Sequence, residues 1–145
     1  MRNVATGMKV RVLAAALCLL TGPALAAAQE KPVKASDGWV RPPAAGETTT
    51  VAFASVENPG MYAIYLTSAT SDAAGKVEFR DAGKGPQALE FVAVLPQDTT
   101  YMDPKGVHMH LSALKRPLKA GDTVSITLKT ELGVEVQVAA VVKQE

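Results

Sequence analysis

The fold is decided by residues 123–143, which read TVSITLKTELGVEVQVAAVVK. Residues 123–128 alternate polar side chains with β-branched or leucine side chains, and residues 134–140 continue the alternation. A period of two is typical of a strand with one buried face, so we expect two strands here, with Val124, Ile126 and Leu128 pointing inward. Glu131-Leu132-Gly133 between them predicts a hairpin turn.

The rest of the chain repeats this pattern of short apolar or β-branched runs, separated by Gly, Pro, Asn and Asp. Repeated short strands with turn residues between them are typical of a β-sandwich or β-barrel. A chain of 145 residues is the size of one domain. We therefore expect a single all-β domain with strands at residues 33–40, 48–57, 62–70, 76–81, 88–95, 106–113, 123–130 and 134–143.

Residues 1–28 have the pattern of an export signal peptide. Three basic residues come first, residues 12–20 form an uncharged apolar run, and Ala24-Leu25-Ala26 fits the small-x-small cleavage pattern. The apolar run is shorter than the roughly 20 residues that a membrane-spanning helix needs. We expect cleavage after Ala26 or Ala28, which leaves residues 29–145 as an exported domain; the alternative is an uncleaved N-terminal anchor.

The cysteine content limits the chemistry of the exported domain. Cys18 is the only cysteine and lies inside the apolar run. Leu17 before it is a poor fit to a lipoprotein processing site, so we expect a soluble product. Residues 29–145 then contain no cysteine, which excludes disulfides, iron–sulfur clusters, thiolate zinc sites and cysteine nucleophiles.

The charge balance limits the class of partner. Of the 15 basic residues in the chain, three lie in the signal, which leaves 12 basic residues against 14 acidic ones. The exported domain therefore carries a net charge of −2 with neutral histidines, whereas nucleic-acid binding requires a basic face. We expect no nucleic-acid partner.

The two histidines of the chain, His108 and His110, flank Met109 in the run Gly106-Val107-His108-Met109-His110-Leu111. The alternation predicts a strand that turns Met109 inward and both imidazoles to the other face, with Cβ atoms roughly 6–7 Å apart. Two neutral imidazoles at that spacing suit Cu(I), Cu(II) or Zn(II). The alternative is a pair of solvated surface histidines.

Other side chains near this run are weaker candidates. Met102 precedes the strand in a predicted loop, from which its thioether could reach a metal as a third, soft ligand; the alternative is an apolar plug for the barrel mouth. Asp81 and Asp103 could each supply a carboxylate, but turn residues are the better interpretation. The chain has no Ser/His/Asp set, glycine-rich phosphate loop or His-Glu-x-x-His motif, so we predict that it is not an enzyme.

Residues 106–124, GVHMHLSALKRPLKAGDTV, closely resemble the C-terminal part of the periplasmic copper chaperone family PCu(A)C. The resemblance extends through residues 37–43, 51–60 and 76–81, and covers most of residues 33–142. It implies a cupredoxin-like Greek-key β-barrel, in agreement with the strand pattern. It also implies a protein that binds one copper ion in the periplasm and hands it to a copper-enzyme assembly factor or client protein.

The resemblance also implies where the copper ligands of the family fall, which are two histidines and two methionines. His108 matches the second histidine, and His110 stands where the second methionine is expected. Arg80 stands at the first histidine, and the first methionine falls near Gln87. Arginine cannot donate a lone pair and carries a permanent positive charge, so the four-ligand Cu(I) site of the family is either rearranged or lost.

Three hypotheses follow. In the first, copper is carried by His108 and His110 with Met102 as third ligand. In the second, Arg80 pairs with Asp81 or Asp103, and the protein is a paralogue without copper that acts as a protein-interaction module. Separately, Lys115, Arg116 and Lys119 could dock an acidic client, or could belong to a solvated loop. In the third, the two imidazoles sequester zinc.

Overall fold

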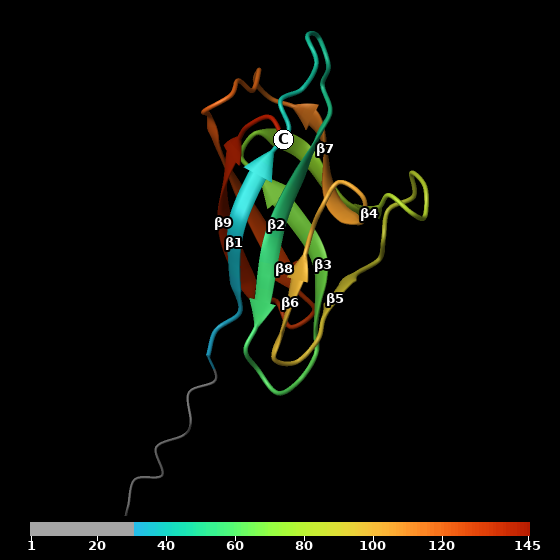
Figure 1. Ribbon diagram of the computed structural model, residues 1–145, viewed down its shortest axis with the longest axis vertical. Coiled ribbons are helices and arrows are strands. Elements are labelled where there is room, and N and C mark those ends of the chain that lie inside the picture. Colours follow the sequence, from blue (N-terminus) through green and yellow to red (C-terminus); the bar gives the residue numbers. More distant parts are fainter. Residues whose placement is uncertain (1–30) are drawn as a thin grey trace, which may run out of the picture.

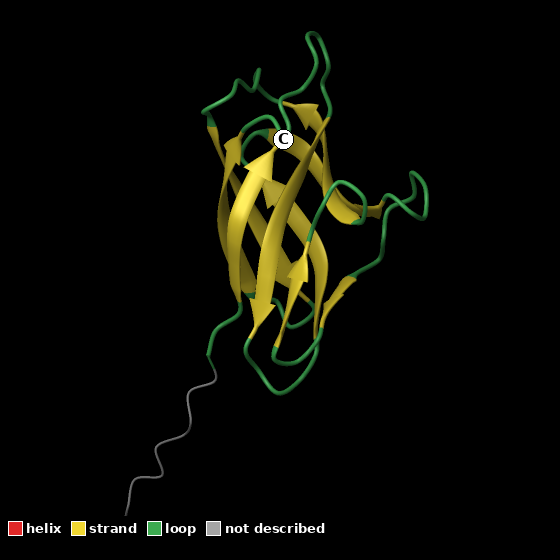
Figure 2. Ribbon diagram, viewed as in Figure 1, coloured by secondary structure: helices red, strands yellow, loops and turns green. Residues whose placement is uncertain are grey.

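The computed structural model describes residues 31–145, and in this range every regular element is a β-strand (Figures 1 and 2). This confirms the prediction of a single all-β domain. The nine strands are β1 (Lys34–Val40), β2 (Thr50–Asn58), β3 (Ile64–Ser71), β4 (Ala74–Asp81), β5 (Val92–Val94), β6 (Asp98–Tyr101), β7 (Val107–Leu114), β8 (Thr123–Thr130) and β9 (Glu135–Val142).

Seven of the strands close into a barrel in the order β1-β9-β8-β3-β4-β7-β2, and β2 pairs with β1 to complete the ring. The pairing of β1 with β9 is parallel and the other pairings are antiparallel. β6 adds to the edge of β2, and β5 adds to the edge of β3. Closure of the seven-strand ring, with β5 and β6 covering the open parts of β3 and β2, leaves only short strands at its edges, which limits edge-to-edge association.

The core is built from the inward residues of the alternating strands. Val124, Ile126 and Leu128 of β8 are fully buried, as predicted, and Met109 is fully buried on β7. Turn residues 131–133 connect β8 to β9, with Gly133 in the left-handed region at φ 79°. This confirms the predicted hairpin, since glycine adopts that conformation without steric cost.

Two strand predictions differ from the structure. Residues 88–95 were expected as one strand, but only Val92–Val94 pairs with β3, and Ala88 makes a single bridge to Arg80. β6 was expected to be loop, because Asp98-Thr99-Thr100-Tyr101 has no alternation of apolar and polar residues. It forms because the edge of β2 beyond its contact with β7 has free backbone groups, which β6 satisfies from Ser55 to Asn58.

The predicted export signal lies outside the described residues. Within residues 31–145, no helix is long and apolar enough to span a bilayer. The two ends of the barrel carry different loops, as Figure 1 shows. The β2–β3, β5–β6 and β8–β9 connections lie at the lower end, where β1 also begins, and residues 41–49 and 115–122 lie at the upper end.

Candidate metal site

The candidate site lies on the outer face of the β4–β7 pair. In the antiparallel register, Arg80 is opposite His108 and Glu78 is opposite His110. Directly opposed residues point to the same face of a sheet, so the two imidazoles share one surface with Arg80 and Glu78. On the other edge of β7, Val51 of β2 is opposite His110.

The backbone orients the His108 ring. Nδ1 of His108 lies 3.1 Å from the carbonyl oxygen of Gly106. Because a carbonyl oxygen can only accept, this contact requires an N–H at Nδ1, so Nε2 is the nitrogen left to bind a metal ion. The Gly106 carbonyl is held by a turn in which Gly106 N donates to Asp103 O at 3.2 Å and Lys105 N donates to the Asp103 carboxylate at 2.8 Å. A histidine oriented in this way through its second nitrogen is typical of metal ligands.

The surroundings of His110 favour its neutral form. Partial burial lowers the pKa of His110 from its ordinary value, and the Arg80 guanidinium lowers it further. Glu78 acts in the opposite direction, and His108 adds a small lowering. A neutral imidazole is the form that binds a metal ion, so the lowered pKa of His110 favours metal binding at that ring.

Arg80 is held by Glu78 on its own strand. Arg80 donates to Glu78 at 2.8 Å, and Lys76 reaches the other oxygen of the same carboxylate at 2.6 Å. Hydrogen bonds from Lys76, which has the larger effect, and from Arg80 lower the pKa of Glu78 to about 2. The expected partners of Arg80 were therefore wrong: Asp81 and Asp103 instead accept bonds from the backbone of Gly83 and Lys105, which confirms their interpretation as turn residues.

Arg80 also has one nitrogen without a partner. Its Nε is buried and makes no hydrogen bond in the structure. An unpaired buried N–H costs free energy, so the Arg80 side chain is not fully satisfied by Glu78 alone. Glu78 could have been predicted as the partner of Arg80 from residues 76–80, because Lys76, Glu78 and Arg80 fall on one face of the strand with alternating charge.

Met102 lies where β2 stops pairing with β7 and begins to pair with β6. The edge of β2 pairs with β7 up to Ala52 and with β6 from Ser55, and Met102 N donates to Ala54 O between them at 3.0 Å. The next residue, Asp103, donates to the carbonyl of Val107 at 3.1 Å. The fold therefore places Met102 near the start of β7. Its side chain is packed in the core with 6% exposure, whereas the imidazoles are partly exposed.

A small hollow adjoins His108, and its aromatic and cationic lining was not anticipated from the sequence. Its volume is about 200 Å³, and it is lined by Arg41, Val51, Phe53, Pro104 and His108. The Phe53 ring lies 6.4 Å from the imidazole and 4.3 Å from the Trp39 ring. Arg41 lies over the Phe53 ring at 5.9 Å and pairs with Glu145 at 2.7 Å. The surroundings of His108 on this side are therefore apolar and cationic.

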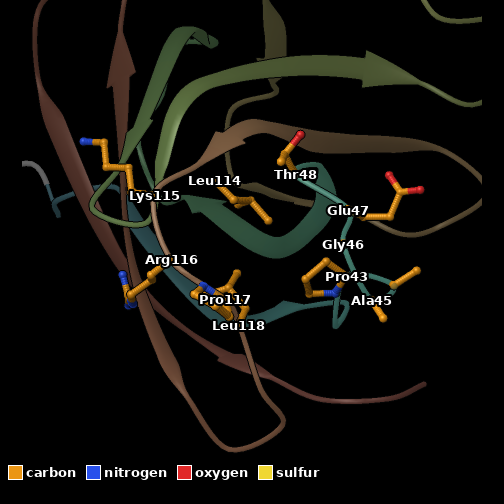
Figure 3. A pocket seen from close by; sticks show the side chains of 11 residues that line it. Pro43, Ala45, Gly46, Glu47, Thr48, Leu114, Lys115, Arg116, Pro117 and Leu118 are labelled. Atoms are coloured by element: carbon orange, nitrogen blue, oxygen red, sulfur yellow. The ribbon is translucent and has the colours of Figure 1, made fainter.

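A larger hollow of about 380 Å³ lies at the upper end of the barrel, between residues 43–48 and 114–118 (Figure 3). The Lys115 and Arg116 side chains point away from Pro43 and Ala45. Arg116 lies 3.9 Å from Asp72 and donates to the Thr123 carbonyl. The hollow lacks converging polar groups, so the structure gives it no binding chemistry of its own.

Two imidazoles lie on the outer face of β7, the Glu78 carboxylate on the same face is bound to Lys76 and Arg80, and the Met102 thioether is packed in the core nearby. Within residues 31–145, no three His, Cys, Asp or Glu side chains are grouped as a metal site. Two imidazoles with a possible thioether form a soft set that suits copper better than zinc or harder cations. The positive charge of Arg80 opposes a cation at this face, and Glu78 offsets it in part.

Comparison with known proteins identifies the group to which this chain belongs. A family model described as "Putative lipoprotein LpqE-like" matches residues 33–142. The chain belongs to the PCu(A)C/LpqE-like family. Its curated relatives include "Putative lipoprotein Lxx21020" of Leifsonia xyli subsp. xyli (strain CTCB07), which is 33% identical over 150 residues and covers 94% of this chain and 89% of the relative.

Solved structures of PCu(A)C domains have the same fold. The copper-bound PCuAC domain from PmoF2 superposes with a TM-score of 0.69 at 25% identity, covering 78% of this chain and 93% of that domain. CuI-DR1885 from Deinococcus radiodurans superposes with a TM-score of 0.66 at 30% identity, covering 83% and 84%. These comparisons confirm the PCu(A)C resemblance and its barrel fold. They place the chain in a family of copper chaperones rather than enzymes.

Proposed function

We propose that this PCu(A)C/LpqE-like protein binds one copper ion through His108 and His110 and passes it to a copper-enzyme assembly factor or client. The observation that carries the proposal is how the structure holds the two imidazole rings. The Gly106 carbonyl orients the His108 ring and leaves Nε2 to bind a metal ion, and burial and Arg80 lower the pKa of His110, which favours its neutral, metal-binding form. The two rings lie on one face of β7. Family membership supports copper as the metal.

Met102 is the proposed third ligand. It follows β6 at the junction of β2 with β6 and β7, near the start of the strand that carries both histidines. Because its thioether is packed in the core, it would have to move outward to bind copper. Such a ligand would bind weakly and release easily, which suits transfer to a client.

The test is a Cu(I) titration of residues 29–145 against a chelating competitor, repeated with Cu(II) and Zn(II). We expect the His108→Ala/His110→Ala double variant to bind Cu(I) at least tenfold more weakly, about 1.4 kcal/mol. Ser112→Ala, on the same face of β7, is the matched control and should bind as the wild type does. Wild-type affinity no higher than that of the double variant would refute the proposal. Tight Zn(II) binding with little Cu(I) affinity would favour zinc sequestration instead.

Met102→Leu tests the third ligand separately. It should weaken Cu(I) binding and leave Zn(II) binding unchanged, since a thioether prefers the softer ion. Met61→Leu is the control, because Met61 is exposed in the β2–β3 connection. Equal Cu(I) affinity of the two variants would remove Met102 from the ligand set.

The Arg80–Glu78 pair supports the second candidate function, a paralogue without copper that acts as an interaction module. The pair occupies the surface opposite both imidazoles and adds a fixed positive charge. The same titration separates the two functions, because this candidate requires that neither histidine contributes to metal affinity.

We also propose that the domain is exported to the periplasm and released as a soluble protein after cleavage near residues 26–28. The signal pattern of residues 1–28 supports export, as does the lipoprotein description of the family. Intact-mass measurement of the cell-envelope protein tests this. A mass that begins at residue 27 or 29 supports the proposal, whereas a lipid-modified Cys18 would replace it with a membrane-anchored form.

A further inference from the structure

The lower end of the barrel exposes large apolar side chains on three separate connections. Met61 and Tyr62 lie in the β2–β3 connection with 68% and 78% exposure, Leu95 follows β5 with 56%, and Leu132 is in the β8–β9 turn with 79%. Figure 1 shows these connections gathered at one end. Isolated apolar residues on a surface are ordinary, but a cluster of this kind marks an interaction site.

Hydrogen bonds hold two of these connections together. The side chain of buried Asn58 donates to the carbonyls of Tyr62 and Val94 at 2.8 and 3.1 Å, and accepts from Gly60 N at 3.0 Å. Gln97 N donates to the Gly60 carbonyl at 3.1 Å. The Met61, Tyr62 and Leu95 side chains therefore project from a fixed backbone.

The third connection is attached to the same end through β3. Tyr65 N donates to the Glu131 carboxylate at 2.8 Å, and Glu131 N donates to the Tyr65 carbonyl at 3.0 Å. Tyr65 in turn packs edge-on against exposed Phe91 at 5.2 Å. The hydrogen bonds fix the β8–β9 turn, and with it Leu132, relative to β3.

The charges near this end favour an electrically neutral partner. Glu90 and Glu131 lie beside the Tyr65–Phe91 pair, and Asp98 begins β6. No Lys or Arg occurs in residues 58–66, 90–98 or 130–135. The nearest described cations on the strands, Lys34 and Lys129, are opposite Glu57 and Glu135 in the strand register. This end therefore has no excess of positive charge to attract an anionic surface. Tyrosine beside aliphatic side chains is typical of a membrane–water interface.

The position of the residues before β1 indicates what kind of surface lies next to the lower end of the barrel. β1 begins at Lys34 at the lower end, so the residues before Lys34 join the barrel there. Those residues connect the barrel to the membrane only until the predicted export signal is cleaved, and the family model is described as "Putative lipoprotein LpqE-like". The candidate copper site is at the level of Val51, seven residues along β2 from Asn58, which corresponds to about 23 Å.

We propose that Met61, Tyr62, Leu95 and Leu132 form a membrane-contact surface that inserts into the interface of an uncharged lipid bilayer. The barrel would stand on its lower end, with His108 and His110 raised above the lipid headgroups. This surface does not depend on copper, so the proposal stands whether or not the protein binds metal.

Vesicle flotation of residues 29–145, which contain every strand of the closed barrel, tests the proposal with phosphatidylcholine vesicles. We expect the wild type to float with the vesicles and the Met61→Ser/Tyr62→Ser/Leu132→Ser variant to bind at least tenfold more weakly. Val141→Ser, an exposed apolar residue of β9 near the upper end, is the control and should float as the wild type does. Because all these positions are exposed, thermal unfolding should be nearly unchanged.

A probe on an introduced cysteine reports insertion directly, because residues 29–145 have no other cysteine. An environment-sensitive fluorophore on Leu132→Cys should shift to the blue with vesicles, and the same fluorophore on Ala120→Cys, at the upper end, should not. Three results would each overturn the proposal: no flotation of the wild type, equal flotation of the triple variant, or binding to cell membranes that is abolished by protease pretreatment of those membranes. Concentration-dependent dimers that the triple variant loses, without vesicle binding, would show that a second copy covers this end.

Discussion

Arg80 on β4 lies directly opposite His108 on β7, and Glu78 beside it holds the guanidinium at 2.8 Å. A fixed positive charge thus faces the side chain best oriented to bind copper. The affinity of the site depends on the balance between the two free imidazoles and this charge.

Replacing Arg80 with histidine should strengthen copper binding. The change removes a cation from the site and adds a third imidazole opposite His108, at the position where the PCu(A)C resemblance places a histidine. We expect Cu(I) affinity to rise at least tenfold, about 1.4 kcal/mol, in a competition titration. Lys76→His, on the same strand face but opposite Ser112, is the control. An equal gain for both variants would mean that only the net charge matters.

Acid should weaken the fold partly through Glu78. Its pKa is lowered from 4.5 to about 2 by Lys76 and Arg80, so the ionised form is favoured in the folded state. The resulting stability is present above pH 4.5 and is lost as the pH falls toward 2. Glu78→Gln should be less stable than the wild type at pH 7, and the difference should shrink across that window. Urea midpoints at several pH values measure it. The exposed loop variant Glu47→Gln should keep the wild-type profile.

Fluorescence should report copper at His108. Trp39 is the only tryptophan and contacts Phe53, which lies next to the His108 ring. Cu(II) bound there should quench Trp39 emission in a saturable way, whereas Zn(II), a filled-shell ion, should not. His108→Ala should abolish the saturable part. Quenching that is unchanged in this variant would place the metal elsewhere.

Gly38 should tolerate no side chain. A Cβ atom there would lie 2.8 Å from Val138 Cγ2 and 3.0 Å from the Ala139 carbonyl oxygen, where β1 passes β9. Gly38→Ala should therefore lower the free energy of unfolding by about 1–3 kcal/mol, as overpacking does. Gly83→Ala, whose Cβ would meet its nearest atom at 3.4 Å, should change it by less than about 0.5 kcal/mol. Urea denaturation of both variants measures the difference.

The sequence predicted strand positions most accurately where one face of a strand is buried and the other is exposed to solvent. Residues 123–130 alternate cleanly, and both ends of β8 match the prediction. The sequence was least informative for strands that form only by pairing with a segment distant in the chain. β6 is short and polar, and it forms only because β2 leaves its lower edge free.

The candidate site likewise has features that the sequence predicted and features that only the structure shows. The shared face of His108 and His110 follows from their spacing on β7. The orientation of the His108 ring depends on the Gly106 carbonyl, and the partner of Arg80 depends on the geometry of three candidate carboxylates, two of them close in sequence and one on a distant turn. Residue types alone could not choose between Glu78, Asp81 and Asp103.

The parallel pairing of β1 with β9 has a consequence for biogenesis. Trp39 and Val40, near the start of the barrel, pair with Val141 and Val142, near its end. The ring cannot close until almost the whole chain is available, and contacts between such distant residues form slowly. On the export route proposed above, the seam that completes the barrel can form only once the C-terminal strand is available, which places ring closure late in folding.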